Sequence, residues 1–179
     1  TTHLAALDTY ALFEPLDVMR AEITGLARKS VSIATANALP AFINVTRTKG
    51  LGILAGSLFD CDGNPVANAL VTLSSTSGAG NAAPTFVEGA AVFYFSAGAS
   101  ELPVNRTTQG DTNTNGKFVV IEIPPTVATE RYFLQVWGFP LAGDVAMGIP
   151  GLTLLSEVEA PAFGDSVVSI DMLPTEGLR

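Results

Sequence analysis

The sequence predicts an all-β fold: an antiparallel β-sandwich of about seven strands, preceded by an N-terminal extension that contains a short helix. Three observations predict this class. Short apolar runs with the alternation of strands recur from Gly52 onward, turn-forming residues separate these runs, and no segment after residue 50 has a convincing helical period. We therefore divide the 179 residues into an extension, 1–50, and a sandwich, 51–179.

The N-terminal extension contains three segments with different patterns. Weak alternation over residues 4–10 predicts an extended segment, whereas residues 16–26 fit a strand or a helix equally well. Ser30 is a suitable N-cap, and Pro40 is expected to stop a helix. These two signals predict a short helix over residues 30–39. We expect the whole extension to pack on the sandwich or on a neighbouring molecule.

The first strands of the sandwich surround a strong turn signal. Residues 52–59 alternate, so that Ile53 and Leu54 face opposite sides. The run Asp62-Gly63-Asn64-Pro65 predicts a turn, because Asp-Gly accepts positive φ and proline fixes its own φ. Residues 66–74 form the next predicted strand. Together these segments predict an antiparallel hairpin.

Five further strands complete the predicted sandwich. Residues 75–90 are rich in Ser, Gly and Ala and predict a long loop, and residues 112–115 predict another turn. The predicted strands are 91–95, 117–121, 131–137, 151–157 and 166–172. In residues 131–137 both faces are apolar enough to be at least partly covered.

The composition indicates a protein that associates with another protein or with a second copy of itself. Hydrophobic residues make up 47% of the chain, charged residues make up 15%, and the mean hydropathy is +0.38. Ordinary domains contain about 25% charged residues, so this chain is apolar for a soluble monomer. We expect a protein partner or a second copy of the chain to cover part of its surface. No uninterrupted apolar run of about 18 residues exists, so no membrane-spanning helix is predicted.

Charge and cysteine content exclude two other classes. The net charge is -8, and the nine basic residues are scattered, whereas nucleic-acid binding requires a positive patch. Cys61 is the only cysteine, which excludes an intrachain disulfide and a cysteine-based zinc site. We predict neither a nucleic-acid partner nor a cofactor.

Several of these motifs together resemble the carboxypeptidase regulatory-like domain. They are the 52–73 strand-turn-strand unit, the Asn113–Phe118 turn and strand, Pro124-Pro125 and the 132–137 strand. The resemblance covers residues 50–140 and implies a transthyretin-like, or prealbumin-like, sandwich of seven strands. It also implies a non-catalytic accessory module of a secreted, periplasmic or cell-surface protein. Residues 75–110 depart from the family pattern by inserting an extra strand.

Aromatic residues are the candidate ligand or interface positions. Adjacent aromatics in a strand point to opposite faces, so some of them must leave the core or meet a covering segment. Core packing accounts for most of them. The remainder are predicted to contact a protein or to stack on a carbohydrate. The candidates are Phe93, Tyr94, Phe95, Tyr132 and Trp137.

Oxygen-bearing side chains give a candidate calcium site. Asp111, Asn113 and Asn115 match the start of a calcium loop, and counting from Asp111 places Glu122 at the twelfth position. Residues 117–121 are predicted as a strand rather than the helix that such a loop requires, so a hairpin turn is the competing interpretation. Residues 60–64 offer a second cluster of the same kind, for which an ordinary turn also competes.

Catalytic residues are scarce in this sequence. His3 is the only histidine, and a hydrolase would have to use it as its base. An isopeptide crosslink between Lys49 and Asp171, assisted by Glu122, is a further hypothesis. The sequence therefore predicts a protein that is not an enzyme but a structural or interaction subunit of an exported or cell-surface assembly. A carbohydrate-binding accessory module is the alternative.

Overall fold

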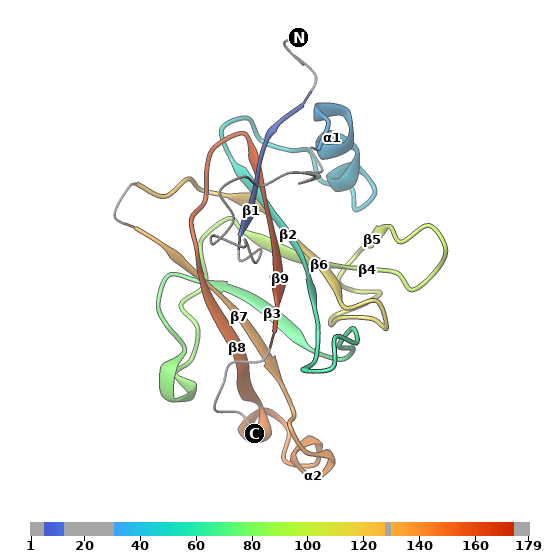
Figure 1. The fold of residues 1–179 in the computed structure, drawn as a ribbon, viewed down its shortest axis with the longest axis vertical. Coiled ribbons are helices and arrows are strands. Elements are labelled where there is room, and N and C mark those ends of the chain that lie inside the picture. The colour runs from blue at the N-terminus through green and yellow to red at the C-terminus, as the bar shows by residue number, and fades with distance from the viewer. Residues whose placement is uncertain (1–5, 13–30, 128–129, 174–179) are drawn as a thin grey trace, which may run out of the picture.

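The computed structural model describes residues 6–12, 31–127 and 130–173 (Figure 1). Two sheets face each other, which confirms the all-β sandwich. The described residues form nine strands, where the sequence predicts about seven. The short strand β5 was not predicted. The strands are β1 (Asp8–Leu12), β2 (Gly52–Leu58), β3 (Leu70–Ser74), β4 (Ala91–Phe95), β5 (Pro103–Val104), β6 (Lys117–Ile123), β7 (Tyr132–Gly138), β8 (Thr153–Ala160) and β9 (Ser166–Met172).

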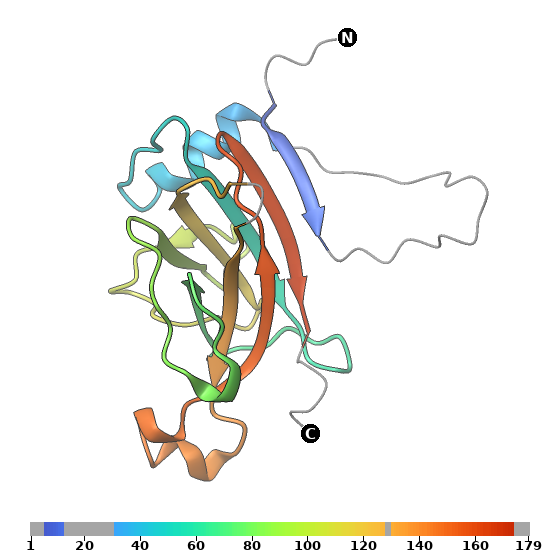
Figure 2. The same ribbon diagram turned by 90° about the vertical axis from the view of Figure 1, so that its left-hand side faces the viewer.

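The two sheets differ in size and in strand direction. The larger sheet has the order β1-β9-β2-β6-β4-β5, and the smaller has the order β3-β7-β8. Figure 2 shows the two layers side by side. Strand β9 runs parallel to both β1 and β2, while every other pairing between strands is antiparallel among the described residues. The larger sheet is therefore mixed, and the prediction of a purely antiparallel sandwich is wrong at these two pairings.

The predicted hairpin of β2 and β3 is wrong, because these strands lie in different sheets. The predicted turn does form: the Asp60 N–H donates to the Asn64 carbonyl at 2.8 Å, and Phe59 and Pro65 form an isolated bridge. However, β6 and β9 occupy both edges of β2. No edge of β2 is left for β3, and after the turn the chain crosses to the opposite sheet.

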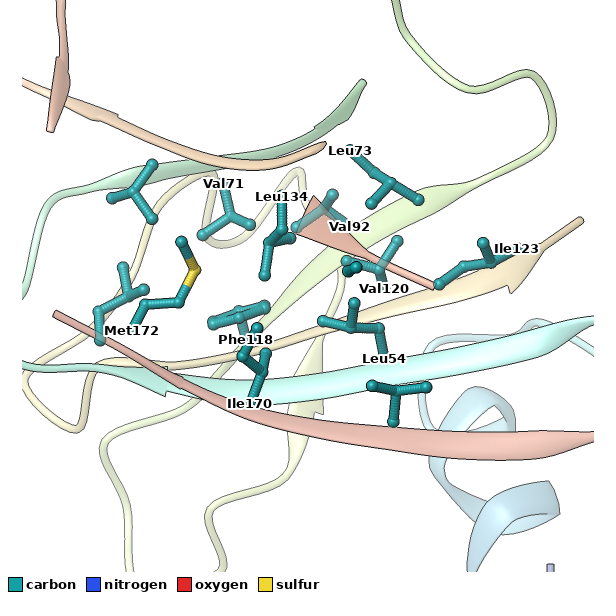
Figure 3. Close-up of a cluster of buried hydrophobic side chains, with 14 of the residues drawn as sticks. Leu54, Val71, Leu73, Val92, Phe118, Val120, Ile123, Leu134, Ile170 and Met172 are labelled. Atoms are coloured by element: carbon teal, nitrogen blue, oxygen red, sulfur yellow. The ribbon is translucent and has the colours of Figure 1, made fainter. Parts of the chain in front are cut away.

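The main core lies between the two sheets (Figure 3). Leu54, Phe118 and Ile170 point from the larger sheet toward Val71 and Leu134 of the smaller one, and all five side chains are buried. Neighbouring residues of the larger sheet face the other way. Their opposite orientation follows from the two-residue period of a strand, and it creates a second apolar cluster on the outer face of that sheet.

Helix α1 (Ile33–Ala41) lies on this outer face. Ala36 belongs to the second cluster together with Ile53 and Val119 of the larger sheet. The helix begins after Ser32, whose Oγ accepts the Thr35 N–H at 3.0 Å. Ser30, the predicted cap, lies outside the described residues.

Helix α1 ends at Ala41, one residue after Pro40, so the predicted short helix that stops at about Pro40 is confirmed. Pro40 lies inside the last turn, where its own carbonyl accepts the backbone N–H groups of Ile43 and Val45 in the turn that follows. Proline fixes φ near the helical value but cannot donate the hydrogen bond to the carbonyl four residues earlier, and only Ala41 of the helix follows it. In the part of the chain that the structure describes, no helix is long and apolar enough to cross a membrane.

Candidate functional site

The outer face of the three-stranded sheet carries a row of polar and aromatic side chains. Thr72, Gln135 and Trp137 point away from the main core, opposite to their neighbours Val71 and Leu134. Trp137 Nε1 donates to Thr72 Oγ1 at 3.1 Å, and Thr72 Oγ1 donates to Gln135 Oε1 at 3.2 Å. This chain of hydrogen bonds fixes the indole ring against strand β3.

The segment after β3 is held on this face by Glu157 of β8. The Glu157 carboxylate accepts hydrogen bonds from Ser77 Oγ at 2.6 Å, from the Gly78 N–H at 2.6 Å and from Gln135 Nε2 at 2.8 Å. Asn81 Oδ1 accepts the Leu154 N–H at 3.0 Å farther along β8. The predicted loop 75–90 is therefore anchored across the sheet in its first part.

A cavity of about 360 Å³ opens between this anchored segment, strand β3 and the segment after β7. Its walls come from positions distant in sequence and are mostly apolar. They are Leu70, Val71, Thr72, Asn81, Ala83, Pro84, Phe86, Tyr94, Arg106, Trp137, Ile149 and Leu152. We call this cavity the β3 pocket.

Tyr94 lines the β3 pocket, and its side chain is fully buried. Its Oη accepts the Val71 N–H at 2.8 Å. Burial is the main cause of a raised pKa of this hydroxyl. The hydrogen bond from Val71 and the positive charge of Arg106 oppose that rise in pKa, and the smaller effect of Asp111 adds to it.

Arg106 is the one cationic side chain in the wall of the β3 pocket. It is exposed, and no residue in the described part of the chain forms a salt bridge or hydrogen bond with its guanidinium. The pocket therefore combines apolar walls, one available cation and one buried hydroxyl.

An exposed apolar segment continues from the edge of the β3 pocket. It comprises residues 140–150, with α2 (Ala142–Val145) and the start of the 3₁₀ turn η2 (Ile149–Gly151), and we call it the apolar tip. Figure 2 shows this orange segment projecting beyond the end of the sandwich. Its large side chains are exposed: Leu141 by 68%, Val145 by 58%, Met147 by 59% and Ile149 by 87%.

The apolar tip has a defined local structure. The only charged side chain within it is Asp144, whose Oδ2 accepts the Leu141 N–H at 3.0 Å. Gly151 packs so closely on the Asp144 carbonyl that an added Cβ would overlap that oxygen. The carboxylate thus caps α2, and the surface that the tip offers to a neighbour is dominated by aliphatic groups.

The structure corrects the predicted aromatic platform. Phe93, Tyr94 and Trp137 are buried, and Phe95 and Tyr132 are only partly exposed. Phe93 belongs to the cluster under α1 and Tyr94 to the main core, as their alternation requires. The structure brings only Tyr94 and Trp137 together, in the wall of the β3 pocket.

Sequence reasoning missed Phe86 and the apolar tip. Phe86 is largely exposed at the edge of the β3 pocket, as is Ile149. A usable signal was present in both places, because large apolar residues stand within two residues of a proline and outside the predicted strands. In such a position an apolar side chain has no regular sheet face on which to be buried.

The candidate calcium residues form a hydrogen-bonded turn. Asn113 Oδ1 accepts the Thr114 N–H at 2.8 Å, and Asn115 Oδ1 accepts the Lys117 N–H at 3.1 Å. Glu122 lies near the far end of β6, at a bulge with φ 59°, and its Oε1 accepts the Thr48 N–H. Asp111 approaches Tyr94 closely enough to affect its pKa.

Strand geometry separates Glu122 from the other candidate ligands. The five residue-to-residue steps from Lys117 to Glu122 span roughly 16 Å in a strand, so Glu122 does not converge on the turn. Within residues 6–12, 31–127 and 130–173, no group of three or more His, Cys, Asp or Glu side chains is placed to hold a metal ion. At the other candidate cluster, the Asp60 carboxylate accepts the backbone N–H groups of Asp62 and Asn64, which lower its pKa.

The remaining predicted residues do not assemble into a site. His3 lies outside the described residues. Asp171 pairs with Ser57 at one end of β9. Lys49 lies near the other end, because the N–H of the next residue, Gly50, donates a hydrogen bond to Asp165. The six residue-to-residue steps from Asp165 to Asp171 span roughly 20 Å along a strand. The proposed isopeptide pair is therefore wrong.

No protein-family model matches this chain, and no curated protein matches it. The resemblance to the carboxypeptidase regulatory-like domain stays a prediction.

Proposed function

We propose that this chain is a non-catalytic structural or interaction subunit of an exported or cell-surface assembly, and that it joins a second copy of itself through the apolar tip. The observation that carries this proposal is the exposure of Leu141, Val145, Met147 and Ile149 on one short projecting segment. Contiguous apolar surface of this kind marks interaction sites on soluble proteins.

The energetic argument concerns removal of the tip from water. Fully burying a side chain such as Leu, Val, Met or Ile contributes about 1.5–3 kcal/mol. Each tip brings four such side chains to the contact when two tips meet. The tip is already held by the Asp144 cap and by the close packing of Gly151, so little additional ordering opposes association.

The charge distribution favours a second copy as the occupant. At a net charge of -8 two copies repel each other over most of their surfaces, but the tip contains one carboxylate, and that group caps its own helix. Residues 140–150 contain no Lys or Arg, which an anionic membrane surface would attract. A surface patch that meets its own copy forms a closed two-fold dimer.

The exported location and the finer fold class rest on the family resemblance. The two-sheet sandwich and the turn at residues 113–116 support that resemblance. The carbohydrate-binding alternative has less support. Stacking on a sugar requires an open ring face, and Tyr94 and Trp137 are buried.

Native mass measured by light scattering over a range of concentrations tests the proposal. We expect a mass twice the 18.5 kDa of the chain. Met147→Asp should give a monomer, because a charge at the contact is costly to desolvate. Phe42→Asp is the matched control, since Phe42 is exposed by 56% near the end of α1, and it should remain dimeric. A wild-type monomer at all concentrations, or a dimer of Met147→Asp, would contradict the proposal.

A further inference from the structure

We propose that the β3 pocket binds an amphiphile with an apolar chain and one carboxylate head group, which pairs with Arg106. This ligand site shares only Ile149 with the proposed dimer contact. Arg106 lies between β5 and β6, outside the apolar tip, whereas Ile149 is common to the pocket edge and the tip.

The size and lining of the β3 pocket fit the apolar chain of such a ligand. Its volume of about 360 Å³ falls at the lower end of ligand pockets, which span about 300–1,000 Å³. Leu70, Trp137 and Leu152 supply apolar walls. Phe86 and Ile149 are largely exposed at the edge, so an inserted chain would remove them from water.

Two polar groups of the pocket suit the head group. The Arg106 guanidinium has no partner in the described part of the chain, and its planar fork matches a carboxylate. Tyr94 Oη receives the Val71 N–H, and no acceptor for its own proton is present among the described residues. The hydroxyl thus keeps an unused donor beside the pocket, and the fully buried side chain has to shift before that donor can meet an anionic oxygen.

The local charges also favour an anion. Asp111 is the carboxylate that acts on Tyr94, and its effect on the Tyr94 hydroxyl is smaller than that of Arg106. A sugar would need several hydrogen-bonding groups, whereas most of the pocket wall is apolar. A cationic amphiphile would meet Arg106 with like charge. The carboxylate amphiphile is the ligand class that uses both the walls and the cation.

Trp137 provides a direct reporter of binding, because it is the only tryptophan and lines the pocket. We would titrate sodium decanoate, below its micelle concentration, into the full chain and follow the intrinsic fluorescence. Decanol and decyltrimethylammonium have the same apolar chain with a neutral and a cationic head group. We expect saturable binding of decanoate. Both analogues should bind with an affinity that is lower by about tenfold or more.

Matched variants test the role of Arg106. Arg106→Gln should weaken decanoate binding about tenfold or more, whereas Arg106→Lys should restore part of it. Lys49→Gln removes one positive charge from an exposed residue that is not part of the pocket wall and should leave binding unchanged. Circular dichroism verifies that each variant is folded.

Three results would overturn the ligand proposal: no fluorescence change with decanoate, equal affinity for decyltrimethylammonium, or unchanged decanoate binding by Arg106→Gln. Light scattering on the same samples separates the two proposals. A dimer that does not bind decanoate contradicts only the pocket assignment, whereas a monomer that binds decanoate contradicts only the tip contact.

Discussion

The hydroxyl of Tyr94 accepts the backbone N–H of Val71 at 2.8 Å and thereby links the two sheets of the sandwich. Val71 lies on β3, an edge strand of the three-stranded sheet, and Tyr94 lies on β4 of the opposite sheet. An unpaired N–H at an edge strand is a site for unwanted pairing with another chain. Tyr94 satisfies this N–H from within the fold.

Tyr94→Phe should destabilise the fold by about 1–3 kcal/mol, because it leaves the buried Val71 N–H without its acceptor. Urea unfolding followed by circular dichroism gives the free energy of unfolding. Phe95→Leu, on the same strand with a partly exposed side chain, serves as the comparison and should lose less stability. Equal stability of Tyr94→Phe and wild type would show that this hydrogen bond contributes nothing.

Tyr94 should also make stability depend on alkaline pH. Burial raises its pKa in the folded state above the usual value near 10. The folded state therefore holds the proton more tightly than the unfolded state. This contribution is fully present below about pH 10 and is lost as the pH rises through the folded pKa. The free energy of unfolding of wild type should fall more steeply above about pH 10 than that of Tyr94→Phe, and parallel pH profiles would refute this assignment.

Asp165 should make stability depend on acidic pH. The Gly50 N–H and the Arg47 guanidinium, at 3.0 Å and 2.6 Å from Oδ1, lower its pKa below the usual 3.8. Its contribution is thus present above about pH 4 and is lost as the pH falls through the lower folded pKa. Asp165→Asn should be less stable than wild type near neutral pH, and the difference should shrink toward about pH 2.

Asn suits this test because Asp165 has a φ of 51°, a conformation that Asn also accepts. Asp171→Asn removes the same charge from an exposed position on β9 and controls for net charge. Thermal unfolding across the acidic range supplies the comparison. A stability difference between Asp165→Asn and wild type that does not vary with pH would argue against the ion pair.

Gly56→Ala should destabilise the fold by about 1–3 kcal/mol or more. A Cβ at this position would overlap the Ile170 carbonyl oxygen and lie 2.8 Å from the ring of Phe118. The parallel pairing of β2 with β9 would have to shift. Gly98→Ala is the matched control, because an added Cβ there has no neighbour within 4 Å. Equal melting temperatures of the two variants would contradict the close packing described for β2.

Local patterns in the sequence predicted many strands well. Strands β4 and β9 have the predicted bounds, since short alternating runs end at clear turn residues. Strand β7 also shows the alternation expected of a strand, since Leu134 lies in the core and Gln135 lies on the opposite face. These features depend on residues that are close in sequence.

Features that depend on distant contacts were not predicted. The crossing of the chain between β2 and β3 follows from the pairing of β2 with β9, more than one hundred residues later. The burial of Tyr94 depends on β3 in the other sheet. Whether the Arg106 guanidinium is free to bind a ligand depends on which carboxylates the fold brings beside it. Neither a strand period nor a motif contains this information.

Crosslinking at the apolar tip tests the central claim most directly. In a Cys61→Ser background, which removes the only native cysteine, Val145→Cys places one thiol on the tip and Phe42→Cys places one near the end of α1. The two native side chains are similarly exposed. With a short bismaleimide, the account predicts covalent dimers from Val145→Cys and monomers from Phe42→Cys. Monomers from Val145→Cys, or equal dimer yields from both variants, would contradict a dimer formed through the tip.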